Sequence, residues 1–68
     1  MKFEYNPDVD AAYIYLKYPM KEGECKKTEE LNKENIVLDL DGSGKIIGVE
    51  ILNASKVLSK KVMEEAIV

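Results

Sequence analysis

Two neighbouring stretches of the sequence alternate apolar and polar residues, and this alternation limits the folds open to the chain. In 36–40, "IVLDL", every second residue is Ile or Leu, and 45–52, "KIIGVEIL", repeats the pattern with Ile, Val and Ile. A period of two is typical of strands with one buried face. The "DGSG" between them has glycines at 42 and 44, which suit the positive φ of a tight turn. The sequence therefore predicts a β-hairpin here.

The N-terminal third carries similar signals. Residues 2–5 alternate in polarity, "NPD" follows with turn chemistry, and "DAAYIYLKY" is rich in residues that favour a pleated surface. We expect strands over 2–5 and 11–18. In the second strand Tyr13 and Tyr15 share one face. The opposite face carries the smaller apolar side chains Ala12, Ile14 and Leu16.

Residues 25–31 fit two structures. The run "KKTEELNKEN" has the propensity for a helical turn, but it also suits a polar edge strand, where charges discourage unwanted pairing. We favour a strand over 25–31, because strand 36–40 needs a partner.

The C-terminal segment changes period. Asn53 is a good N-cap, and the apolar residues after it fall at 54, 57, 58, 62, 66 and 67, which is the one-sided spacing of a helix. We expect one helix over 54–67. It needs an apolar surface to cover, and the predicted sheet offers one at Ile14, Leu16, Leu38, Leu40, Val49 and Ile51.

These elements predict a single α+β domain over 1–68, an antiparallel β-meander of four to five strands with one C-terminal helix packed on one face. A chain of 68 residues buries only about 60% of its unfolded surface, so its core is small. Its single cysteine cannot form an internal disulfide, and without histidine a structural zinc site is not expected. Self-association as a homodimer is the remaining common source of stability.

Net charge and hydropathy limit the kinds of partner that we expect for this chain. The net charge of −3 comes without a basic stripe, so no nucleic-acid partner is expected. No apolar run is long enough for a membrane span, and "MKFEYNPD" lacks the apolar core of a signal peptide. With one thiol and no signal, we expect a cytoplasmic protein.

The hairpin turn also matches a calcium-binding pattern. Asp39, Asp41, Ser43 and Glu50 occupy positions one, three, five and twelve of an EF-hand loop. Such a loop needs a helix running into it, whereas 36–40 has the alternation of a strand. Calcium binding at these four residues is therefore the alternative hypothesis, and a hairpin turn with solvated acids is the first.

Two blocks of the sequence resemble a known family. "YNPDVDAAYIYL" (5–16) is similar to the family's opening of Tyr, a Pro-containing turn, Asp-Ala and Tyr-Ile, and "IVLDLDGSGKIIGVEILNASK" (36–56) to its strand, turn, Glu-Ile-Leu and Ala-Ser. On these residues the chain resembles a small prokaryotic family, domain of unknown function twenty-two eighty-three. The resemblance implies a sheet with a helix, no established activity, and small accessory proteins that are sometimes suggested to accompany toxins. The segment 59–68 departs from it, since many members stop earlier.

Four residues are the candidates for an interaction face: Tyr13, Tyr15, Asp10 and Glu50. Alternation places Glu50 beside the tyrosines on the face that the helix does not cover. Asp10 stands at a strand entrance, where it is expected to accept backbone hydrogen bonds. An enzyme using Asp10, Glu50 and the tyrosines is a weaker hypothesis, because a small flat sheet offers little cleft for acid–base chemistry.

The sequence thus predicts no catalytic residues and no cofactor. It predicts a small interaction module that self-associates or binds a protein partner, and the family resemblance implies an accessory or antitoxin-like role for it.

Overall fold

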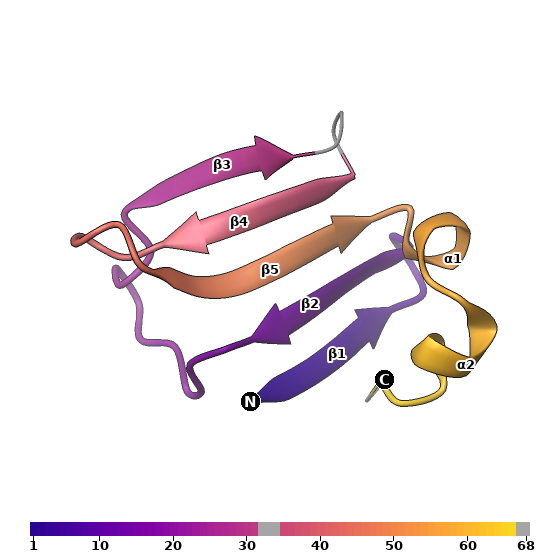
Figure 1. Ribbon diagram of the computed structural model, residues 1–68. Helices are drawn as coiled ribbons and strands as arrows, with labels where there is room; N and C mark the ends of the chain where they lie inside the picture. Colours follow the sequence, from indigo (N-terminus) through magenta and orange to yellow (C-terminus); the bar gives the residue numbers. More distant parts are fainter. Residues whose placement is uncertain (32–34, 67–68) are drawn as a thin grey trace.

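The computed structural model describes residues 1–31 and 35–66 (Figure 1). Its elements, in chain order, are β1 (Lys2–Asn6), β2 (Ala11–Tyr15), β3 (Lys27–Leu31), β4 (Ile36–Leu40), β5 (Ile46–Leu52), α1 (Ala54–Val57) and α2 (Lys60–Met63). All five predicted strands are present. The ambiguous segment 25–31 is a strand from Lys27 onwards, and all five of its residues are exposed, as expected of a charged edge strand.

The strands form one antiparallel sheet in the order β1-β2-β5-β4-β3. Two runs of hairpin-connected strands, β1-β2 and β3-β4-β5, meet where β2 pairs with β5. The connection over 16–26 therefore crosses from the middle of the sheet to its far edge (Figure 1). The order is close to the predicted meander, but the strand beside β2 is β5 instead of β3.

The register separates the side chains into two faces. Phe3 pairs with Ile14, Ile14 with Val49, and Val49 with Leu38. We call the side that bears these residues the apolar face, and its members on β1, β2, β5 and β4 are Phe3, Tyr5, Ala12, Ile14, Val49, Ile51, Ile36, Leu38 and Leu40. We call the other side the tyrosine face, and it bears Lys2, Glu4, Tyr13, Tyr15, Gly48, Glu50, Val37, Asp39, Thr28 and Glu30.

The predicted single helix over 54–67 is wrong: there are two helices of four residues each. The chain turns to extended backbone at Leu58, and Ser59 begins α2 by accepting a hydrogen bond from the Val62 N–H at 3.2 Å. A serine that caps a new helix competes with continuation of the old one, which explains the break. Residue 67, the end of the predicted helix, lies outside the described residues.

Both helices gather at the end of the sheet where β5 ends and β2 begins, and neither lies over β3 or β4 (Figure 1). The core at this end is built on Ala12, Ile51 and Ala54. Half-buried neighbours from sheet and helices surround it: Phe3, Tyr5, Ile14, Val49, Val57, Leu58 and Met63. The helices thus cover only part of the surface predicted for them. Leu16 lies beyond the end of β2 and is 45% exposed.

Candidate functional site

A hydrogen-bonded junction fixes the helices to the β1–β2 turn. Asp10 Oδ1 accepts hydrogen bonds from the Tyr5 hydroxyl at 2.8 Å and from the Ser55 N–H at 3.0 Å, while Oδ2 accepts from Ser55 Oγ at 2.7 Å. The Asp10 carbonyl accepts from the Ala54 N–H at 2.9 Å. The hydrogen bond from Ser55 is the main cause that lowers the pKa of Asp10, followed by that from Tyr5. The expected backbone hydrogen bond to Asp10 is confirmed.

The junction replaces the predicted capping by Asn53. Asn53 precedes α1 with left-handed backbone, φ 53°, and its side chain makes no capping hydrogen bond. The Asn53 amide donates instead to Asn35 Oδ1 at 3.2 Å. Asp10 therefore satisfies the first turn of α1 from a site 45 residues away from Ser55 in sequence. Its carboxylate is occupied with this task and is turned to Tyr5, on the apolar face.

The tyrosine face carries a row of paired residues across the sheet. Glu4 is the cross-strand partner of Tyr13, Tyr13 of Glu50, Glu50 of Val37, and Val37 of Glu30. Carboxylates therefore recur on every second strand, about 10 Å apart for strands spaced about 4.8 Å. As predicted, Glu50 and Tyr13 share this face.

A glycine lets Tyr13 lie across the central strand. A Cβ added to Gly48 would stand 2.0 Å from the Tyr13 hydroxyl oxygen and 2.7 Å from Cζ, so only glycine fits beneath the ring. The hydroxyl reaches β4 and donates a hydrogen bond to Asp39 Oδ2. Burial raises the pKa of Tyr13 well above its usual range, and the hydrogen bond to Asp39 adds to this. Tyr13 is thus held in place as a neutral phenol.

Three tyrosines continue from this point towards the edge of the sheet. The Tyr13 and Tyr15 ring centroids are 4.6 Å apart, and those of Tyr15 and Tyr18 are 5.3 Å apart. At the edge, Lys2 Nζ lies 4.5 Å from the centroid of the Tyr18 ring and 3.1 Å from Glu4 Oε2. The hydrogen bond from Lys2 is the main cause that lowers the pKa of Glu4. This face therefore already holds one ammonium group between a carboxylate and an aromatic ring.

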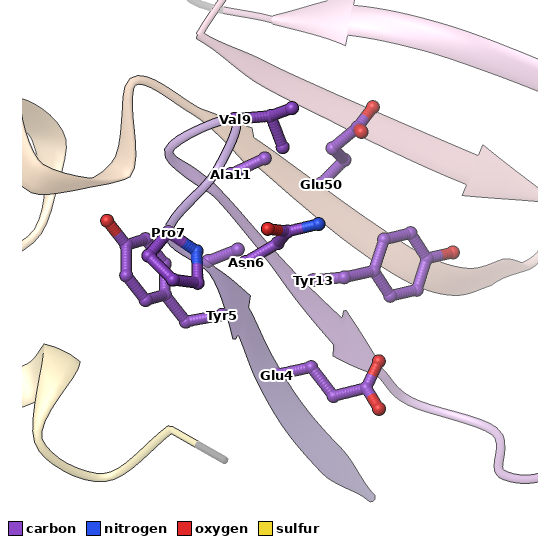
Figure 2. Close-up of a pocket in the computed structure, with 9 residues that line it drawn as sticks. Glu4, Tyr5, Asn6, Pro7, Val9, Ala11, Tyr13 and Glu50 are labelled. Atoms are coloured by element: carbon purple, nitrogen blue, oxygen red, sulfur yellow. The ribbon is translucent and has the colours of Figure 1, made fainter. Parts of the chain in front are cut away.

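A groove of about 470 Å³ opens on the tyrosine face. Figure 2 shows Glu4 and Glu50 on either side of Tyr13, with Pro7 and Val9 of the β1–β2 turn beside them. The lining residues are Glu4, Tyr5, Asn6, Pro7, Val9, Ala11, Ala12, Tyr13 and Glu50. The expectation that a flat sheet offers little cleft overlooked this turn, which adds a wall at one end of the strands. In the described parts of the chain, the Glu50 carboxylate makes no hydrogen bond or ion pair.

The hairpin prediction for the acidic loop is confirmed, and the four proposed calcium ligands do not converge. Asp41 Oδ1 accepts from the Ser43 N–H, the Ser43 hydroxyl and the Lys45 N–H at 2.9, 2.8 and 3.0 Å, which closes the turn. The Lys45 N–H is the main cause that lowers the pKa of Asp41. Asp39 is bound to Tyr13, and Glu50 stands within β5. Within 1–31 and 35–66, no three acidic or thiol groups are clustered as metal ligands.

Sequence reasoning identified Tyr13, Tyr15 and Glu50 but missed Glu4 and Gly48. Glu4 becomes part of the site only through the β1–β2 register, which brings it beside Tyr13. Gly48 stands in the middle of a strong strand, where a glycine weakens pairing. That anomaly is the signal that could have indicated a ring lying over the strand.

Comparison with known proteins confirms the resemblance. Residues 2–55 match a protein family described as "Protein of unknown function (DUF2283)". An uncharacterized protein of Methanocaldococcus jannaschii is 36% identical over 59 residues, which is 87% of this chain and 46% of that relative. The chain thus spans about half the length of this relative. No solved structure shows significant similarity. None of the helices described is long and apolar enough to cross a membrane.

Proposed function

This chain belongs to the DUF2283 family of proteins of unknown function. We propose that it is a small interaction module whose tyrosine face binds a segment of a partner protein that carries lysine or arginine.

One observation carries this proposal. Lys2 shows how the face holds a cation: its ammonium pairs with the Glu4 carboxylate and contacts Tyr18, donating to the hydroxyl at 3.0 Å and lying 4.5 Å from the ring centroid. Glu50 and Tyr13 offer the same two groups in the groove, and no lysine of the described residues pairs with Glu50. A guanidinium or ammonium group from a partner would complete this pair.

The charge of the whole face supports a cationic ligand. Its acids are Glu4, Glu30, Asp39 and Glu50, and Lys2 is the only base among the residues that define it. Since the carboxylates of the row are about 10 Å apart, a peptide in the polyproline II conformation, with three residues per turn and a rise of about 3.1 Å per residue, would present every third side chain to them. An accessory or antitoxin-like protein that holds a basic partner would use such a face.

The alternative roles have less support. Acid–base catalysis by Asp10 and Glu50 is disfavoured because Asp10 is engaged by Tyr5 and Ser55 at the helix junction.

We also propose a cytoplasmic location for the protein. The unpaired thiol of Cys25 suits a reducing compartment, which supports this location.

The test uses the peptide acetyl-RGGRGGR-amide and its citrulline analogue, which keeps the shape of the side chains and removes their charge. In amide NMR titrations, the arginine peptide should shift the signals of Tyr13, Glu50 and Glu4, and the citrulline peptide should not. Glu50→Gln should weaken binding at least tenfold. Because Glu50 is half-buried and has no partner among residues 1–31 and 35–66, this substitution should change the free energy of unfolding by no more than about 0.5 kcal/mol.

Glu64→Gln is the matched control, because it removes the same charge from an exposed site after α2. It should leave binding within twofold of the wild type. Equal weakening by the two substitutions, or equal binding of the citrulline peptide, would contradict a specific site on the tyrosine face.

A further inference from the structure

The buried core of this chain is small for a folded domain. Among the described residues, the hydrophobic side chains that are buried are Ala12, Leu40, Ile47, Ile51 and Ala54, and two of these are alanines. The radius of gyration is 11.9 Å, whereas a compact domain of 68 residues has about 11 Å. The molecule is a single sheet, and its two short helices cover only one end of the apolar face.

The apolar face is uncharged across four strands. One row runs Phe3, Ile14, Val49, Leu38, and the next runs Tyr5, Ala12, Ile51, Ile36. Charges reach this face at two places: at the Asp10 carboxylate, which is bound by Tyr5 and Ser55 at the helix junction, and on edge strand β3, at Lys27 and Glu29. The helices stand at one end of it (Figure 1), and Leu38 on β4 is outside the cluster that they close.

The area of this face is at the lower end of the about 300–600 Å² that the largest apolar patch on a typical monomer covers, and such patches are often functional. Four strands spaced about 4.8 Å, with five residues at about 3.3 Å each, span about 19 by 17 Å. Monomers rarely expose contiguous apolar patches larger than a few hundred Å². Ile36 and Leu38 are half-buried there and lie outside the cluster that the helices close.

We propose that the apolar face packs against the same face of a second copy of this chain, so that two five-stranded sheets form a β-sandwich. Two sheets packed in this way lie about 10 Å apart, with their inner side chains interdigitated. This proposal concerns the opposite side of the sheet from the groove and is independent of the proposed function.

The distribution of charge favours a second copy of this chain as the partner, and it indicates that the apolar face is the interface. In a two-fold dimer the same patch lies on both sides, so it must be complementary to itself. An uncharged apolar surface meets this condition. The tyrosine face does not, because Glu4, Glu30, Asp39 and Glu50 of one copy would face the same acids of the other. Dimerisation through the apolar face leaves the groove open.

The test compares two lysine substitutions on one strand. Leu38 lies on the apolar face and Val37, its neighbour in β4, on the tyrosine face. Light scattering after size exclusion at 100 µM should give twice 7.7 kDa for the wild type and for Val37→Lys. Leu38→Lys should raise the dimer dissociation constant at least a hundredfold. Loss of the dimer in both variants, or in neither, would contradict the proposal.

Two wild-type measurements cover the case in which Leu38→Lys does not fold. The melting temperature should rise with protein concentration, as it does when unfolding includes dissociation. In a mixture of labelled and unlabelled chains, isotope-filtered NOEs should connect the methyl groups of Leu38 and Val49 between copies. A mass of 7.7 kDa up to 1 mM with a constant melting temperature would overturn the proposal, and so would a dimer without these NOEs.

Discussion

The two faces of this sheet are made by the same five strands, yet they differ in what holds their side chains. On the apolar face, contacts are made by aliphatic packing, and the helices secure one end through Asp10, Tyr5 and Ser55. On the tyrosine face, side chains are fixed by hydrogen bonds and ring contacts, as in Tyr13 to Asp39, while Glu50 is left without a partner in the described structure. The difference supports our proposal that one face stabilises the fold and the other binds a ligand.

The residues of the two family-like blocks, 5–16 and 36–56, also divide between the helix junction and the tyrosine face. Tyr5, Asp10, Ala54 and Ser55 build the helix junction. Tyr13 belongs to the tyrosine face and requires its glycine. The family-like sequence blocks therefore contain residues with two different structural roles, and mutations can test each role separately.

The largest expected loss of stability comes from a substitution at the end of the apolar face where the helices pack. Ile51 is 5% exposed in the core, whereas Ile46 on the same strand is 48% exposed. Ile51→Ala should lower the free energy of unfolding by about 2–5 kcal/mol through lost burial and a cavity, and Ile46→Ala by less than about 1 kcal/mol. Urea denaturation followed by circular dichroism measures both. Similar losses from the two would mean that the core is not where we place it.

An intermediate effect is expected on the tyrosine face. Gly48→Ala forces the Tyr13 ring away from β5 and should cost about 1–3 kcal/mol. In a Tyr13→Leu background the clash is absent, and alanine should then be better than glycine by about 0.5–1 kcal/mol, as is usual in a strand. Thermal unfolding of the four proteins in this double-mutant cycle gives the coupling. An equal cost of Gly48→Ala in both backgrounds would rule out the packing of Tyr13 over Gly48.

The smallest effect depends on pH and belongs to the helix junction. The pKa of Asp10 in the folded protein lies below its ordinary value of 3.8. A carboxyl group with a lowered folded pKa stabilises the fold above the unfolded pKa, and the contribution is lost as pH falls through the folded value. Asp10→Asn should therefore be less stable than the wild type at pH 7, and the gap should narrow below pH 3.8.

Urea midpoints at pH 7, 5 and 3 measure this gap. Asp8→Asn, in the same turn, is the control and should shift the midpoint little at any of these values. A gap for Asp10→Asn that stays constant from pH 7 to pH 3 would show that the carboxylate is not what holds the junction.

Local patterns sufficed to predict the strands, because an alternation of period two is written in consecutive residues such as 36–40 and 46–52. The break between α1 and α2 was not predicted, since the apolar spacing continues through Ser59 and only its capping hydrogen bond ends the run. The order of the strands also depends on the long connection 16–26, whose path no local pattern specifies.

The site was predictable only in part for a related reason. Tyr13 and Glu50 were placed together by alternation alone. Glu4 and Gly48 join them through cross-strand register, and register is a property of paired strands rather than of one segment. The capping of α1 by Asp10 likewise joins residues 45 positions apart.

The most direct test of the account is the accessibility of the two faces to a soluble gadolinium chelate, measured by NMR on the wild-type protein at 1 mM. If the apolar face is covered by a second copy and the tyrosine face is open, the methyl signals of Leu38 and Val49 should stay sharp while those of Val37 broaden. Equal broadening of Leu38 and Val37, which are neighbours on opposite faces of β4, would contradict the division of tasks between the two faces.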